Sequence, residues 1–181
     1  MKKIAIVTLS DFNNYGNRLQ NYALERIITS QGYDVVSLVD FRPNLLKTSV
    51  KTIIKKDGIK FTDRMKKIRR LKNFLDFDKK YVNTFPVNAG EFSSVSDDEY
   101  HCFIVGSDQV WNPDWAKYTY DRMFLRFCSP TKRISYAASF GVDKIPEKWV
   151  DKYKAGLIDF KALSVREDKA VDIVKNTIGI T

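Results

Sequence analysis

The 181-residue sequence predicts an α/β fold, in which one parallel sheet carries helices on both faces. Three observations lead to this prediction. Short apolar runs lack the alternation of half-exposed strands, helical patterns separate these runs, and a hydrophobic content of 44% suffices for one core. Strands that alternate with helices favour right-handed crossovers and parallel pairing, as in a Rossmann-like sheet. The length fits a single Rossmann-like domain over residues 1–181.

Five apolar runs are the predicted strands. They are Ile4 to Leu9, Val35 to Val39, Phe103 to Val105, Ile134 to Ala138, and Leu163 to Val165. Runs of this kind are typical of strands that helices cover on both sides.

Helical patterns fill the intervals between the runs. From Asn17 to Gln31 the apolar residues recur at threes and fours, and Gly32 then supplies a stop. The same spacing recurs from Pro146 to Phe160, where the proline suits a helix start. A short helix is expected from Asp168 to Lys175, and a connecting loop from Asn88 to Glu99.

A basic segment interrupts this order. Between Lys47 and Lys80 there are 13 Lys and Arg against 4 Asp, so the net charge of +9 of the whole chain belongs to this segment. Apolar spacing predicts at least one amphipathic helix after Thr62, and hence a basic helical insertion around residues 47–80. The basic face is either a solvated surface or a contact for anionic lipid head groups or an anionic substrate. Nucleic acid is not expected as a partner, because no RNP, helix-turn-helix or zinc-finger spacing accompanies the charge.

Cysteine usage and hydropathy limit the location of the protein. Cys102 and Cys128 form no CxxC motif, so we expect neither a metal site nor a disulfide framework, and a reduced, cytoplasmic protein fits best. The apolar run from Ile4 to Leu9 is too short for a signal peptide. No stretch approaches the roughly 20 apolar residues that span a bilayer.

Polar residues cluster after three of the predicted strands, where parallel sheets bind their ligands. The first cluster runs from Asn13 into the following helix and supplies Asn14, Tyr15, Gly16, Asn17 and Gln20. It lacks both the G-x-G-x-x-G of dinucleotide sites and the G-K-[ST] of a P-loop. A turn with an Asn helix cap is the alternative interpretation.

The second and third clusters offer different chemistry. The second supplies Gly106, Ser107, Asp108, Gln109, Trp111 and Asn112. Gly106 permits a tight turn and close approach of a ligand, and Trp111 can offer a flat face to a sugar ring; alternatively, Asp108 caps a turn and Trp111 is core. The third supplies Arg166 and Glu167, which an internal ion pair explains nearly as well.

Four motifs carry a family resemblance. "NNYGNRLQNYAL", "FIVGSDQVWNP", "RISYAASFG" and "SVRED" occur in this order along nearly the whole chain, which resembles the N-terminal half of the polysaccharide pyruvyl transferase family. The second and third motifs together are the most specific, and the third adds Ser139 to the candidate site residues. His101 departs from the pattern, because the family usually has Asp before this strand.

The resemblance implies an architecture and a reaction. Members are similar to B-type glycosyltransferases, with two Rossmann-like domains that face each other across a cleft. They transfer pyruvyl from phosphoenolpyruvate to two hydroxyls of a sugar, and so form a ketal on a cell-surface polysaccharide or its lipid-linked precursor. No metal or redox cofactor is implied. The family's phosphate-binding residues lie in its C-terminal domain, so we expect this chain alone to be inactive.

The resemblance also suggests roles for the clusters. Asp108 is the candidate for orienting or deprotonating an acceptor hydroxyl, with Asn14, Asn17 and Gln20 as hydrogen-bonding partners and Trp111 as a stacking surface. The protein is then expected in the cytoplasm, with a peripheral contact at the inner membrane face through the basic segment. Two alternatives stay open. One is a non-catalytic saccharide-binding module, and the other is a nucleotide-sugar glycosyltransferase of the same architecture.

Overall fold

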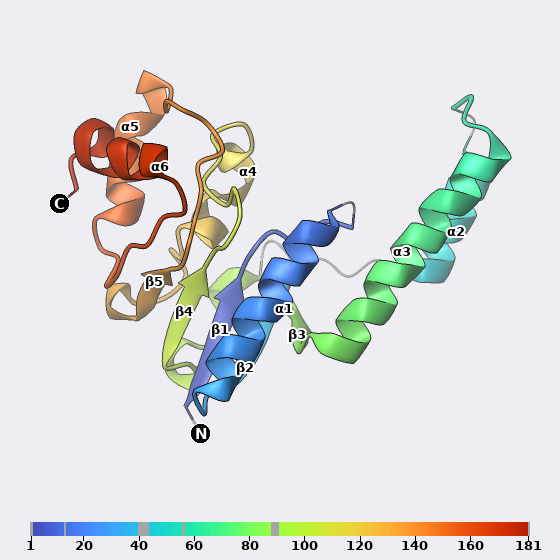
Figure 1. Cartoon of the computed structure of the whole chain (residues 1–181), viewed down its shortest axis with the longest axis horizontal. Coiled ribbons are helices and arrows are strands. Elements are labelled where there is room, and N and C mark those ends of the chain that lie inside the picture. Colours follow the sequence, from blue (N-terminus) through green and yellow to red (C-terminus); the bar gives the residue numbers. More distant parts are fainter. Residues whose placement is uncertain (1, 13, 40–43, 56, 88–90, 181) are drawn as a thin grey trace.

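The fold is built on one five-stranded sheet in which every strand is parallel to its neighbours (Figure 1). The computed structural model describes residues 2–12, 14–39, 44–55, 57–87 and 91–180. The sheet order is β3-β2-β1-β4-β5. The strands are β1 (Lys3–Val7), β2 (Asp34–Val39), β3 (Thr84–Pro86), β4 (Cys102–Val105) and β5 (Arg133–Ser135). The predicted α/β class with a parallel, Rossmann-like sheet is confirmed.

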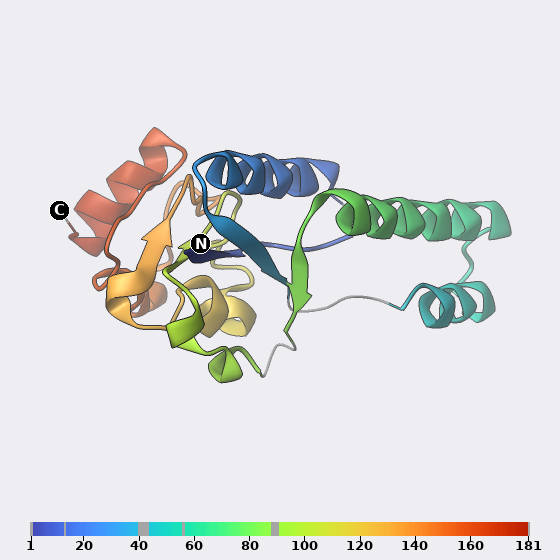
Figure 2. The same cartoon turned by 90° about the horizontal axis from the view of Figure 1, so that it is seen from below.

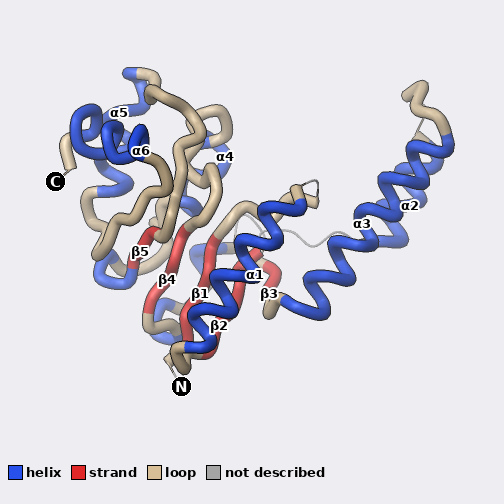
Figure 3. The backbone as a smooth tube through the Cα atoms, in the orientation of Figure 1, coloured by secondary structure: helices blue, strands red, loops and turns tan. Residues whose placement is uncertain are grey.

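Helices occupy the connections between the strands (Figure 3). The α-helices are α1 (Tyr15–Ser30), α2 (Leu45–Ile54), α3 (Phe61–Tyr81), α4 (Ala116–Met123), α5 (Glu147–Leu157) and α6 (Asp168–Asp172). A π-helical segment, Ile173–Ile178, continues α6, and short 3₁₀ turns lie at Phe92–Ser94, Asp97–Glu99 and Pro130–Lys132. Among the described residues, no helix has both the length and the apolar character needed to cross a membrane.

Both faces of the sheet are covered, as the apolar runs predict. On one face, Ile4 and Ile6 of β1 pack with Leu24 of α1. The alternate residues of β1, Ala5 and Val7, belong to a larger core on the other face, which includes residues of α4 and α5. Figure 2 shows α1, in blue, and α4, in yellow, on opposite sides of the sheet. A strand buried on both faces needs apolar residues at successive positions, which explains the missing alternation.

Two edges of the sheet differ from the sequence prediction. The strand predicted to reach Ala138 ends at Ser135, because Ala137 has a φ of 48°, in the left-handed region, which interrupts an extended chain. In the segment predicted as a strand from Leu163 to Val165 there is one isolated parallel bridge, which joins Ala138 to Val165, and a second bridge reaches Ala162 just before it. β3 was not predicted, because it is short and contains a proline, which an edge strand tolerates.

The basic segment forms a helical hairpin, α2 and α3, that projects from the sheet (Figures 1 and 2). Its second helix is the amphipathic helix predicted after Thr62. α3 is fixed to α1 by a buried ion pair, in which Arg18 Nε lies 3.1 Å from Asp78 Oδ1. Nearby, the ring of Tyr15 stacks on that of Phe74, with centroids 4.5 Å apart. The hairpin is thus anchored at one end, beside the start of α1.

A buried polar cluster joins α1 to β2. Ser37 Oγ lies 3.1 Å from Asn21 Oδ1 and 3.3 Å from Glu25 Oε2, and the Asn83 amide donates to Glu25 Oε1 at 2.9 Å. Burial raises the pKa of Glu25 above its ordinary value of 4.5. One hydroxyl proton cannot satisfy two acceptors at once. When Glu25 is protonated it can donate to Ser37, which then donates to Asn21, so the hydrogen bonds of the cluster favour the same direction of shift as burial does.

The raised pKa of Glu25 predicts a pH-dependent effect of Glu25→Gln. A raised carboxyl pKa favours the folded state below the ordinary value of 4.5, and this stabilisation is lost as pH rises through the folded-state pKa. The amide stays neutral and can make the same bonds. We therefore expect the thermal midpoint of the variant, relative to wild type, to increase from pH 4.5 to pH 7.5. A difference that stays constant or shrinks over this range would contradict the raised pKa of Glu25.

Candidate functional site

Two polar clusters meet at the point where the strand order reverses. β1 pairs with β2 on one side and with β4 on the other, so the loops after β1 and β4 leave the sheet in opposite directions. Across this point, Asn17 Nδ2 donates to Asp108 Oδ2 at 2.9 Å. The prediction that both clusters share the carboxyl edge of the sheet is confirmed.

Asn17 is held in the first turn of α1. The side chain of Asn14 caps the helix, because its Oδ1 accepts from the Asn17 amide at 3.2 Å. Asn17 itself is only 3% exposed. Its Oδ1 has no hydrogen-bond partner within the described residues. A buried amide oxygen without a donor is costly, but this atom is enclosed by the protein, so Asn17 orients Asp108 and does not itself contact a ligand.

Asp108 is oriented by hydrogen bonds to both carboxylate oxygens. Besides the bond from Asn17, Oδ1 accepts from the Gln109 amide at 2.8 Å. The backbone around it is fixed too, since the Ser139 amide donates to the Asp108 carbonyl at 2.9 Å. Asp108 is half-buried, and a carboxylate so oriented can accept a proton or a hydrogen bond from a ligand.

Gly106 is required by the neighbouring loop. Its φ is 126°, and a Cβ at this position would lie 2.1 Å from the carbonyl oxygen of Tyr136. The close approach predicted at this glycine therefore exists, but the group that approaches is backbone from the loop after β5. The glycine lets the two loops pack side by side.

The third cluster joins the same edge through Ser139. The Ser139 hydroxyl donates to Glu167 Oε1 at 2.6 Å, and Arg166 Nη2 donates to the same oxygen at 2.9 Å. The ion pair that the sequence left as an alternative is thus present. Ser139 is fully buried, so it orients Glu167 and has no surface for an acceptor, which corrects its prediction as an acceptor-binding residue. All three clusters lie along one edge.

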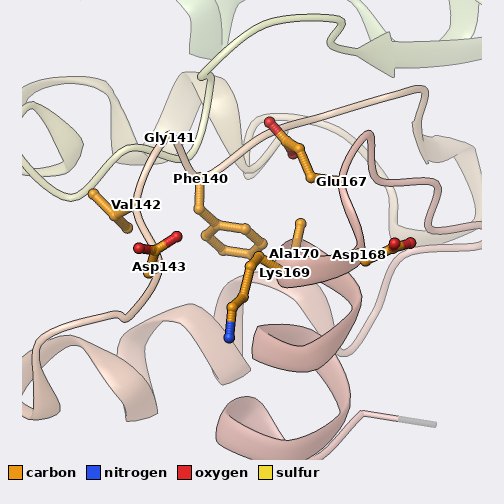
Figure 4. A pocket seen from close by; sticks show the side chains of 8 residues that line it. All are labelled: Phe140, Gly141, Val142, Asp143, Glu167, Asp168, Lys169 and Ala170. Carbon is orange, nitrogen blue, oxygen red and sulfur yellow. The ribbon is translucent and has the colours of Figure 1, made fainter.

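A cavity of about 540 Å³ lies at the third cluster (Figure 4). It is lined by Phe140, Gly141, Val142, Asp143, Glu167, Asp168, Lys169 and Ala170. Figure 4 shows the Phe140 ring between the loop that carries Asp143 and the segment that carries Glu167 and Lys169. Carboxylates and an ammonium group around an aromatic ring suit a small polar ligand. Ser139 links this cavity to the Asp108 loop, because its amide donates to the Asp108 carbonyl and its hydroxyl donates to Glu167.

The prediction that Trp111 offers a stacking surface is wrong. Trp111 is 0% exposed, and its Nε1 donates to the Met123 carbonyl at 2.9 Å. Its ring packs against Phe124 and Phe140, so the alternative interpretation as core is right. The loop after β4 turns inward at this point, because the Trp111 amide donates to the Ser139 carbonyl.

The amides beside Trp111 are structural as well. Asn112 is buried, donates to Gln109 Oε1 at 3.2 Å and accepts from the Asp114 amide at 2.9 Å. Burial leaves Asn112 no surface for an acceptor, which corrects its prediction as a binding residue. The Gln109 side chain packs over Gly141, where a Cβ would come within 2.4 Å of it. These contacts shape the loop that carries Asp108.

The remaining candidates lie around α1 and the start of the Asp108 loop. Tyr15 and Gly16 are exposed in the first turn, and Ser107 is half-buried. Gln20 is half-buried one turn after Asn17, and its buried Oε1 has no hydrogen-bond partner in the described ranges. Asn13 lies outside the described residues. The amide oxygens of Asn17 and Gln20 thus lie on one side of α1, and both are enclosed by the protein.

Arg18 was not among the predicted site residues, although it lies between two of them. Its Nη2 donates to the Ser10 carbonyl in the loop after β1 at 3.0 Å, and its guanidinium pairs with Asp78. A cation in the first turn of a helix is unfavourable to the helix dipole, so the position of Arg18 in the sequence was a signal that it has a specific partner. Arg18 fixes the loop after β1 against α3.

The comparisons with known proteins agree with the geometry. The family model described as polysaccharide pyruvyl transferase matches residues 14–181, which include all three clusters except Asn13 at the start of the first. Searches of curated proteins and of solved structures gave no match. Because the family model covers most of the sequence, this chain belongs to the polysaccharide pyruvyl transferase family.

Proposed function

We propose that this domain binds the sugar acceptor of a pyruvyl transfer from phosphoenolpyruvate, with Asp108 as the general base for the attacking hydroxyl. The observation that carries the proposal is the bond from Asn17 to Asp108 across the strand-order reversal, which orients a half-buried carboxylate at the carboxyl edge of the sheet. A sugar hydroxyl can donate to this carboxylate, because Asp108, unlike Asn17, is only half-buried. Gln20 is half-buried one turn further along the same helix, so part of this residue remains open to an acceptor.

The proposed reaction gives these groups definite tasks. One sugar hydroxyl oxygen bonds to C2 of phosphoenolpyruvate as C3 gains a proton and becomes a methyl group. A second hydroxyl then replaces phosphate at C2 and closes the ketal. Of the two hydroxyl protons that are lost, one is balanced by the proton that C3 gains, and the other leaves with the phosphate. Asp108 accepts the proton of the attacking hydroxyl, which makes its oxygen a better nucleophile.

The other parts of the proposal follow from family membership. Phosphoenolpyruvate is the donor substrate, no further cofactor takes part, and cationic groups of a second domain bind its phosphate and carboxylate. The product belongs to a cell-envelope or exopolysaccharide precursor made on the cytoplasmic side of the membrane. Glu167, held by Ser139 and Arg166, lies in the neighbouring cavity and contacts a more distant part of the acceptor.

Saccharide binding to the isolated chain tests the acceptor site. We expect methyl hexosides with two free, adjacent or 1,3-related hydroxyls to shift the side-chain amide NMR signals of Asn17 and Gln20. Methylation of one of the two hydroxyls should weaken the shifts, because the site recognises the pair that forms the ketal. Asn176 is the internal control, since its exposed amide bonds to Asp172 at a remote position.

Two results would count against the site. Equal shifts at Asn17 and Asn176 would indicate non-specific effects of sugar. The absence of any shift at Asn17 with saturating amounts of every hexoside would remove the proposed acceptor site.

A further inference from the structure

The helical hairpin turns apolar side chains outward. On α2, Leu46, Val50, Ile53 and Ile54 recur at intervals of three and four, so they form one stripe, here called the hairpin stripe. Leu46 is 78% exposed and Ile54 is 68% exposed. α2 has no fully buried residue. A helix of a globular protein normally buries such a stripe.

The side of α2 that packs on α3 is the more polar one. Of the half-buried residues of α2, Leu45 is apolar, whereas Thr48, Ser49 and Thr52 are polar. The Thr52 carbonyl accepts from Arg64 of α3. Arg64 also bonds to the Ile59 carbonyl and to Asp57, and so fixes both helices and the turn between them. The outward position of the hairpin stripe is therefore held by specific bonds across the hairpin.

Cations border the hairpin stripe. Lys47, Lys51 and Lys55 recur every four residues and so form an adjacent ridge on α2. The acids of the hairpin are already engaged: Asp57 pairs with Lys55 and Arg64, Asp63 with Lys66, Asp76 with Lys72, and Asp78 with Arg18. Among the described residues, Lys47 and Lys51 have no ion-pair partner. The ridge keeps an uncompensated positive charge.

We propose that the hairpin stripe and its lysine ridge dock on an anionic phospholipid bilayer, with the apolar side chains in the head-group region and the lysines at the phosphates. Charge complementarity selects this occupant. A second copy of the chain would bring the same lysines face to face, and a neutral apolar partner would leave them unpaired. An exposed apolar stripe beside lysines has the composition of a helix that lies in a membrane interface. The proposal is independent of the acceptor site.

Vesicle flotation of the 181-residue chain tests the docking. We expect it to float with vesicles of phosphatidylcholine containing phosphatidylglycerol, to stay behind with pure phosphatidylcholine, and to release in high salt. Lys47→Gln with Lys51→Gln should weaken binding about 30-fold, at about 1 kcal/mol for each lysine. Leu46→Gln with Ile54→Gln should weaken it roughly 10-fold or more. These four side chains are exposed, so the fold should survive.

Matched controls lie on other helices. Lys148→Gln with Lys175→Gln removes the same charge from exposed positions outside the hairpin. Ile27→Gln replaces an isoleucine of α1 that is as exposed as Val50, at 56%. Both controls should float like wild type. If they lose binding as strongly as the hairpin variants, binding depends on the net charge or on non-specific hydrophobic contact, and the hairpin proposal fails.

A fluorescent label separates insertion from adsorption. Both native cysteines are buried, and burial raises the pKa of Cys128 to about 11, so a thiol-reactive dye should label an introduced cysteine selectively. A polarity-sensitive dye at Leu46→Cys should shift to the blue on anionic vesicles, and the same dye at Lys148→Cys should not. No flotation at low salt, or flotation without this shift, would overturn the proposal. Dimerisation that is lost in Leu46→Gln with Ile54→Gln, without vesicle binding, would assign the stripe to a second copy.

Discussion

Asp108→Asn is expected to lower the turnover of pyruvyl transfer by about 10² to 10⁴, because general-base catalysis typically contributes that much. The test uses a form of the protein that joins this domain to the C-terminal domain of the family. The Michaelis constant for the acceptor should change little, since an amide keeps the size and one hydrogen-bond acceptor of the carboxylate. The measurement is a steady-state assay of phosphate release.

The hydrogen bonds around Asp108 indicate that this substitution leaves the fold intact. The retained oxygen can still accept from the Gln109 amide. The new amide group would face Asn17 Nδ2, which is also a donor. Rotation of the Asn17 amide removes this conflict, because its Oδ1, without a partner in the described residues, then accepts the bond. The thermal midpoint should therefore stay close to that of wild type.

Asp114→Asn is the matched control. It removes the same charge from the same loop, but Asp114 is exposed and its backbone amide, not its side chain, makes the bond to Asn112. Turnover in this variant should be near normal. Normal turnover in Asp108→Asn would rule out Asp108 as the base. A large drop in the thermal midpoint of Asp108→Asn would make its role structural.

The centre of the fold was predictable from sequence, and its edges were not. β1, β2 and β4 are central strands whose alternate residues belong to two cores on opposite faces of the sheet. Such strands need apolar residues at successive positions, which gives a continuous apolar run in the sequence. β3 is an edge strand of three residues, so it carries too few positions for a pattern. The end of β5 depends on the positive φ of Ala137, which no local preference of alanine indicates.

The site divides in the same way. The meeting of Asn17 with Asp108 follows from topology, because residues after parallel strands share an edge. The burial of Trp111 depends on how its loop turns back onto the loop after β5, a tertiary contact without a sequence signal. The same holds for Arg18, whose partner Asp78 lies in the helical hairpin far along the chain. Sequence reasoning thus found the proposed site residue Asp108 more readily than the contacts that support it.

Asp78→Leu is expected to destabilise the protein by about 3 to 5 kcal/mol, because it leaves Arg18 as a buried charge without this carboxylate. For a chain of this size, that loss lowers the thermal midpoint by about 6 to 20 °C. Trypsin should also cleave the lysine-rich hairpin faster, since the ion pair holds α3 against α1. Scanning calorimetry and timed proteolysis measure the two effects.

Two further variants separate the buried pair from charge effects in general. Arg18→Met combined with Asp78→Leu should recover much of the lost stability, because no buried charge remains and apolar side chains fill the space. Lys72→Gln breaks an exposed pair with Asp76 on the same helix, and should cost at most about 0.5 kcal/mol. If Asp78→Leu costs no more than Lys72→Gln, the buried pair does not anchor the hairpin. A double variant less stable than Asp78→Leu would instead show that Arg18 stabilises the loop after β1 through its bond to Ser10, independently of Asp78.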